Sequence, residues 1–266
     1  MVEWAAYGLV FIAGLITALA TGIGALPFFF VPDVSDELNV GLWGVASGIM
    51  LVASVFGLIS EGLNTGPWTT VAVGLIAGGL LVLVANDLLM DAEIDSRTYE
   101  EADFKRLVLI LGVLTVHSFP EGIAIGVSFA ELNLGNGIPF LGFTVPALAI
   151  AMTIAISIHN IPEGVAISIP LRTMGVSEWK MVWWSVFSSL PQPIGAVIAF
   201  GFVQLAEPLL PAGFGFAAGA MIYLVISEFI PSALEAGSDI DGKGYRELVG
   251  GFIAGGGGML LLLVVV

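Results

Sequence analysis

Long apolar runs separated by short polar stretches fill this chain. A helix needs roughly 20 apolar residues to cross the hydrocarbon core of a membrane. We predict eight membrane-spanning helices, at about 4–30, 40–63, 68–90, 107–130, 140–171, 179–205, 212–234 and 248–266. The sequence is therefore expected to form a single transmembrane domain, residues 1–266, of the all-α integral membrane class.

The basic residues support this count and orient the chain. With eight spans, they fall in or beside three connections: Arg97, Lys105 and Arg106 between spans three and four, Arg172 and Lys180 between five and six, and Lys243 and Arg246 between seven and eight. All three connections then lie on one side of the membrane. Because basic loops stay in the cytoplasm, we expect both termini to be extracellular, in a multi-pass protein of the cell membrane.

Composition narrows the class further. Hydrophobic residues make up 58% of the chain and charged residues only 11%, whereas a soluble domain carries roughly 25% charged residues. The mean hydropathy is +1.03. A formal net charge of −15 argues against nucleic acid as a partner. The chain has no cysteine, which excludes disulfides and cysteine metal sites.

Two internal repeats are visible. The nine residues that begin at His117, HSFPEGIAI, recur 42 residues later from His159 as HNIPEGVAI, with six identical positions. A weaker echo links residues 46–50, ASGIM, to residues 217–221, AAGAM. In the eight-span arrangement the paired helices run in opposite directions. Inverted repeats with a site between them are typical of secondary transporters.

The first repeat carries the candidate chemistry. His117 and His159 are the only histidines, and each is followed four residues later by a glutamate, Glu121 and Glu163. Residues i and i+4 lie on one face of a helix, so two such helices offer two nitrogens and two carboxylates around one point. That donor set suits Zn²⁺, and also Fe²⁺ or other first-row dications. Two carboxylates, two neutral imidazoles and one dication sum to zero charge, which favours an occupied site inside a membrane.

Four other polar or soft residues have two interpretations each. Ser118 and Asn160 follow the two histidines, and they either ligate weakly or cap backbone carbonyls that Pro120 and Pro162 free. The amide of Gln192, between two prolines, either lines the path or satisfies the disturbed backbone. Met50 is either a soft thioether ligand or core packing.

The paired His-x-x-Pro-Glu-Gly motifs resemble those of the Zrt/Irt-like (ZIP) metal transporters, especially the bacterial-type branch. Residues 48–54, GIMLVAS, and 228–231, EFIP, are also similar to that family. The resemblance implies import of Zn²⁺ or a related dication such as Fe²⁺, Mn²⁺ or Cd²⁺, a 3+2+3 arrangement of helices with an inverted repeat, and a homodimer.

The resemblance also implies the ligands, and two positions depart from it. The first metal site maps onto His117, Glu121, His159 and Glu163, with Met50 as a possible extra ligand. A second metal, present in some members, would use Ser118, Asn160 and Gln192 together with the two glutamates. Ser118 stands where the family usually has Asn, and Gln192 where two-metal members have Glu. Because only two carboxylates remain, we predict one well-bound metal.

Two rival functions fit the sequence less well. An intramembrane zinc-dependent hydrolase would use a His-Glu-x-x-His helix, and that motif is absent. A retinal-type pump needs a buried lysine, whereas Lys105, Lys180 and Lys243 all flank the predicted helices. The sequence therefore favours a transporter over an enzyme.

Overall fold

The structure, a computed structural model, describes residues 2–31, 34–90, 118–134 and 137–265. Within these ranges seven helices are long and apolar enough to cross a membrane. An eighth helix is described over residues 118–128. The expected all-α membrane protein is therefore confirmed, although the start of the helix predicted at 107–130 lies outside the described residues.

The helices of the first half follow the apolar runs closely. Their bounds are α1 (Val2–Ala25), which continues as a short 3₁₀ turn (Leu26–Phe29), α2 (Asp36–Val52), a π-helical segment (Ala53–Ile59), α3 (Ser60–Thr65) and α4 (Trp68–Met90). The segments from Asp36 to Thr65 form one continuous span. Ser35 begins α2, since its side chain accepts a hydrogen bond from the backbone nitrogen of Leu38, as expected of a helix N-cap.

The second half contains the remaining spans. They are α6 (Ala147–Thr173), α7 (Glu178–Ser189), α8 (Pro191–Leu205), a 3₁₀ turn (Glu207–Leu209), α9 (Leu210–Leu224), a π-helical segment (Val225–Phe229), α10 (Ile230–Ala236), a 3₁₀ turn (Asp241–Gly244) and α11 (Tyr245–Val265). The sixth predicted span is therefore two helices, α7 and α8, which meet at Leu190 immediately before Pro191.

The predicted start of the fifth helix at Phe140 is wrong. Strands β1 (Ile138–Phe140) and β2 (Phe143–Val145) form an antiparallel hairpin there, and α6 begins only after Pro146. Leu141 and Gly142, between the strands, both have positive φ, which is typical of a tight hairpin turn. These residues are as apolar as a helix, so hydropathy alone could not separate the two structures.

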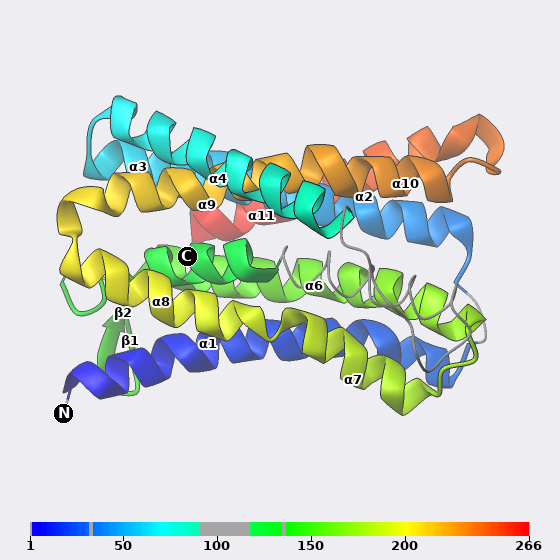
Figure 1. Ribbon diagram of the computed structural model, residues 1–266, viewed down its shortest axis with the longest axis horizontal. Helices are drawn as coiled ribbons and strands as arrows, with labels where there is room; N and C mark the ends of the chain where they lie inside the picture. The colour runs from blue at the N-terminus through cyan, green and yellow to red at the C-terminus, as the bar shows by residue number, and fades with distance from the viewer. Residues whose placement is uncertain (1, 32–33, 91–117, 135–136, 266) are drawn as a thin grey trace.

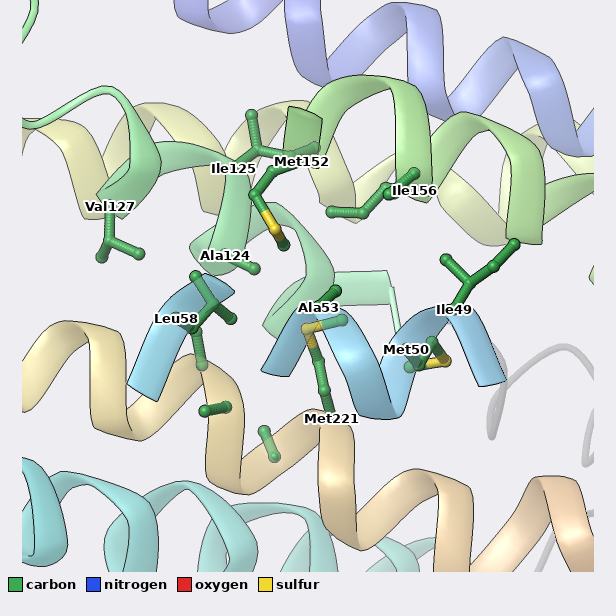
Figure 2. Packing of buried hydrophobic residues seen from close by; sticks show 14 of the residues in the cluster. Ile49, Met50, Ala53, Leu58, Ala124, Ile125, Val127, Met152, Ile156 and Met221 are labelled. Carbon is green, nitrogen blue, oxygen red and sulfur yellow. The ribbon is translucent and has the colours of Figure 1, made fainter. Parts of the chain in front are cut away.

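The helices form two layers (Figure 1). In one layer α1 packs against α6, α7 and α8. In the other, α2 packs against α11 and α4 packs against α9. Buried apolar side chains from α2, α6, α9 and the helix at 118–128 fill the space between the layers, as Figure 2 shows.

The expected inverted repeat is visible in how glycines pack. Gly44 and Gly48 of α2 lie against the backbone carbonyls of Leu248 and Phe252 in α11. At the matching positions of the repeat, Gly215 and Gly219 of α9 lie against the carbonyls of Val71 and Leu75 in α4. In Figure 1 α2 and α9 run in opposite directions. The pair α2–α11 is thus repeated, inverted, as the pair α9–α4.

Both copies of the repeat also share a backbone irregularity. A π-helical segment begins at Ala53, shortly after Met50, and another begins at Val225, shortly after Met221. π-Bulges are rare and occur frequently at functional sites. The sequence similarity between residues 46–50 and 217–221 therefore identifies two spans that share the same π-helical irregularity.

Candidate metal site

The polar residues predicted from the two repeated motifs come together inside the first layer. The helix at 118–128 carries Ser118 and Glu121, and α6 carries His159, Asn160 and Glu163. Gln192 joins them from the first turn of α8. All six side chains are at most 1% exposed. His117, the remaining predicted ligand, lies outside the described residues.

Glycine lets these helices approach closely. A methyl group on Gly122 would meet the backbone carbonyl of Gln192 in α8. A methyl group on Gly164 would likewise meet the backbone carbonyl of Thr21 in α1. Small residues permit this backbone approach between membrane helices. The glycine that follows each glutamate therefore fixes its helix against a different neighbour.

Glu121 lies at the centre of the polar contacts. Its Oε1 is 3.1 Å from Nε2 of His159, and its Oε2 accepts a 2.6 Å hydrogen bond from Nε2 of Gln192. These contacts bring together side chains from three helices. They place one predicted imidazole beside the carboxylate of the other motif, as a shared site requires.

Several atoms that could ligate a metal here have no hydrogen-bond partner among the described residues. Both carboxylate oxygens of Glu163, Nδ1 of His159 and Oδ1 of Asn160 are buried and unpartnered. Buried polar groups are normally hydrogen-bonded, and a buried charge is normally paired or bound to metal. The carboxylate of Glu163 is therefore a candidate ligand for a cation.

The amide of Gln192 is held on its other side by α1 and α6. Its Oε1 is 2.6 Å from the hydroxyl of Thr17 and 3.1 Å from Nδ2 of Asn160. The same Asn160 nitrogen donates to the backbone carbonyl of Thr17 at 2.7 Å. Gln192 thus lies within the site and contacts Glu121, in addition to its place between two prolines.

Sequence reasoning missed Thr17 and its neighbour Thr21. Thr21 lies one turn further along α1, and its hydroxyl is 2.8 Å from that of Ser189 in α7. Both threonines are fully buried. The available signal was two hydroxyl residues spaced i and i+4 within an otherwise apolar run, which places them on one helix face.

Met50 is fully buried, and it packs in the apolar cluster between the layers. Figure 2 shows it on α2 beside Ile49, with Ala53 in the π-helical segment that follows. This position agrees with packing, and it leaves a ligand role for Met50 as a proposal.

The described part of the chain does not by itself complete a metal site. Among those residues, no group of three or more His, Asp or Glu side chains is placed to hold a metal ion. Glu121, His159 and Glu163 supply part of the predicted set, and its fourth member is His117. The four-ligand arrangement therefore remains a prediction.

The fold and the site together define a multi-pass membrane protein with carboxylate, imidazole and amide groups buried between its helices. A model of the ZIP zinc transporter family matches residues 92–264. This chain belongs to the ZIP family. Its relatives are named as transporters, which agrees with the expectation that it is not an enzyme.

Relatives occur in bacteria and eukaryotes. The chain is 33% identical over 238 residues to the zinc transporter GufA of Myxococcus xanthus, covering 85% of this chain and 89% of that protein. It is 32% identical over 238 residues to the zinc transporter ZIPB of Bordetella bronchiseptica, covering 83% and 71%. It is also 41% identical over 228 residues to a putative zinc transporter of Arabidopsis thaliana, covering 84% of this chain but only 34% of that longer protein.

Proposed function

We propose that this protein carries Zn²⁺ across the cell membrane into the cytoplasm through a site formed by His117, Glu121, His159 and Glu163. The observation that carries the proposal is the buried carboxylate of Glu163, which has no hydrogen-bond partner in the part of the chain that the structure describes, in a protein whose relatives are named zinc transporters. Imidazole nitrogen and carboxylate oxygen are both common zinc ligands.

Charge supports a dication as the cargo. A carboxylate at the centre of a bilayer costs about 2.5–3.5 kcal/mol on insertion scales, and Glu121 and Glu163 are both fully inside the helix bundle. One dication with two carboxylates and two neutral imidazoles has no net charge. The loaded site is then the electrostatically favoured state, and release requires the site to open to water.

The amide of Gln192 favours a single metal beside Glu121. Its N–H group contacts Oε2 of Glu121, which is the place where a second cation would share that carboxylate. An N–H donor cannot ligate a metal. We therefore infer one well-bound dication, with the second site of two-metal relatives weak or absent.

Three further residues complete the proposed surroundings. Oδ1 of Asn160 has no hydrogen-bond partner among the described residues, and we propose it as an additional oxygen ligand. Met50 supplies a thioether if α2 approaches the site during transport. Ser118, which is buried beside Glu121 in the same helix, is the weakest candidate ligand.

The two layers suggest how the site opens. Two apolar crevices of about 490 and 390 Å³ lie between them, one lined by α2, α6 and α11 and the other by α4, the 118–128 helix, α8 and α9. Both crevices are open at the surface, where Ile198, Phe202 and Leu261 are exposed, and they follow the boundary along which we propose that one layer moves against the other. Alternating access in inverted-repeat transporters is largely such rigid-body movement.

Orientation and assembly are further parts of the proposal. In Figure 1 the α6–α7 and α10–α11 connections, where the predicted cytoplasmic basic residues lie, are at one end, and both termini lie toward the other. We propose that both termini are extracellular and that the protein works as a homodimer in the lipid bilayer.

Uptake into proteoliposomes that contain a metal-sensitive dye tests the function. We expect wild-type protein to admit Zn²⁺ and the Glu163→Gln variant to admit none, because the neutral amide removes the charge that attracts the cation. Glu178→Gln is the matched control, since Glu178 forms a part-exposed ion pair with Arg172. No zinc uptake by wild-type protein, or full uptake by Glu163→Gln, would contradict the proposal.

The same assay identifies the cargo. Zn²⁺, Fe²⁺, Mn²⁺ and Cd²⁺ are compared at equal free concentrations, and the metal taken up fastest is the preferred cargo.

A separate hydrolysis assay tests the rival function. Zinc-dependent hydrolase activity without any metal flux would favour an intramembrane hydrolase.

A further inference from the structure

The hairpin before α6 exposes a set of apolar side chains that has no part in the proposed zinc site. Ile138 is 42% exposed, Phe140 is 53% exposed, and Leu141, at the tip, is 79% exposed. All three residues of β1 are exposed. We propose that this hairpin is a membrane-interface anchor, with Phe140 and Leu141 inserted at the boundary between the lipid headgroups and the acyl chains.

The residue at the tip is disfavoured in water on two grounds. The strand register leaves Leu141 and Gly142 as a two-residue turn, with φ values of 48° and 85°. Such turns favour Asn-Gly or Asp-Gly, because a bulky side chain rarely adopts positive φ. Leu141 therefore costs free energy through its backbone and again through its exposed side chain. Apolar surroundings remove the second cost.

The two edges of the hairpin argue against another strand as its partner. At the β2 edge, the backbone nitrogen of Asn133 donates to the carbonyl of Thr144 at 3.0 Å, and the backbone nitrogen of Thr144 donates to Oδ1 of Asn133 at 2.8 Å. At the β1 edge, Pro139 lacks the N–H that would bond to an added strand. The exposed apolar side chains are therefore the surface that remains for binding.

The place of the hairpin in the fold fits the membrane interface. In Figure 1 the hairpin and the beginning of α1 lie at the same end of the bundle. Trp4, near that beginning, is 81% exposed, and tryptophan is enriched at membrane interfaces. The membrane span of α6 begins at Ala147, soon after β2. Because an open strand edge is not tolerated in the hydrocarbon core, the interface is the depth that suits both the backbone and the apolar side chains.

Spin labelling measures this depth directly. The chain has no cysteine, so a single introduced cysteine can carry a nitroxide label. With Leu141→Cys in phospholipid vesicles, we expect the label to collide more often with oxygen, which dissolves in the bilayer, than with a water-soluble nickel chelate. Glu131→Cys is the matched control, because Glu131 is exposed in the turn before the hairpin but is charged. Its label should show the opposite order.

A second variant separates membrane contact from folding. Leu141→Asn gives the Asn-Gly sequence that this turn favours, so the hairpin should keep its fold while its tip becomes polar. A label introduced by Ile138→Cys should be accessible to oxygen when Leu141 is present. Adding Leu141→Asn should lower its collisions with oxygen and raise its collisions with the nickel chelate.

Three results would overturn the proposal. A label at position 141 that meets the nickel chelate more often than oxygen would place the tip in water. A label that meets neither reagent would place the tip against protein, such as a second copy of the chain. A label at position 138 that does not respond to Leu141→Asn would show that the tip does not hold the hairpin in the membrane. None of these measurements uses zinc, so they are independent of the proposed transport function.

Discussion

Replacing Gln192 by glutamate is the sharpest perturbation of this site, because it changes one charge and almost no volume. Nε2 of Gln192 is 2.6 Å from Oε2 of Glu121. Two full negative charges at that separation repel by about 6 kcal/mol at an effective dielectric constant of about 20. The Gln192→Glu variant must therefore take up a proton between the two oxygens or bind another cation.

We expect a second dication to bind. Purified wild-type protein should hold one Zn²⁺ per chain and the Gln192→Glu variant two, measured by equilibrium dialysis and elemental analysis. Without metal, the variant should unfold at a lower temperature than wild type. Saturating Zn²⁺ should then raise its melting temperature more than that of wild type, because a ligand stabilises the state that binds it.

Gln192→Leu is the control for the loss of the amide contacts without added charge. It should not gain a second metal, and its melting temperature should respond less to Zn²⁺ than that of the glutamate variant. The opposite result would be a Gln192→Glu variant that still binds one Zn²⁺ per chain and melts like wild type in the presence of chelator. Glu121 and residue 192 would then not share a cation position.

Two other predictions concern the scaffold. Gly48→Ala should lower the melting temperature, because its methyl group would clash with the carbonyl of Phe252. Gly257 has open space around it, so Gly257→Ala should leave the melting temperature unchanged or raise it, since alanine favours a helix by about 1 kcal/mol over glycine. Equal melting temperatures for the two variants would contradict the packing. Arg172→Ala should change the free energy of unfolding by at most about 1 kcal/mol, as measured by thermal or denaturant unfolding, because its ion pair with Glu178 is about one-third exposed on both sides and exposed pairs contribute little.

Much of the fold follows from hydropathy alone because a membrane imposes a minimum length on each apolar helix. The third predicted helix, 68–90, has the bounds of α4. The hairpin before α6 was missed because Phe140, Phe143 and Val145 are apolar in either structure. Gly142 and Pro146 were the available signals, since one permits the positive-φ turn and the other directly precedes α6.

The repeat between residues 46–50 and 217–221 was recognised from five residues. Its physical basis is the packing of helix backbones and not the chemistry of side chains. Glycine recurs in both copies because a backbone carbonyl of a neighbouring helix packs directly against Gly48 and against Gly219. Such positions retain small residues in both copies, whereas lipid-facing positions are free to differ. A short sequence similarity between two apolar stretches thus indicates shared helix packing where the shared residues include glycine.

The site divides in the same way between what a motif reveals and what only the fold reveals. Glu121, His159 and Glu163 were predicted because an i, i+4 pair of ionisable residues on a membrane helix is costly unless it has a function, and the fold brings Glu121 beside His159. The resemblance to the ZIP family already placed Asn160 and Gln192 at one site, whereas no local pattern predicts that Thr17 of α1 meets Gln192. The motif thus predicts where a dication binds, and only the fold shows the buried hydrogen bonds that surround Gln192 beside that place.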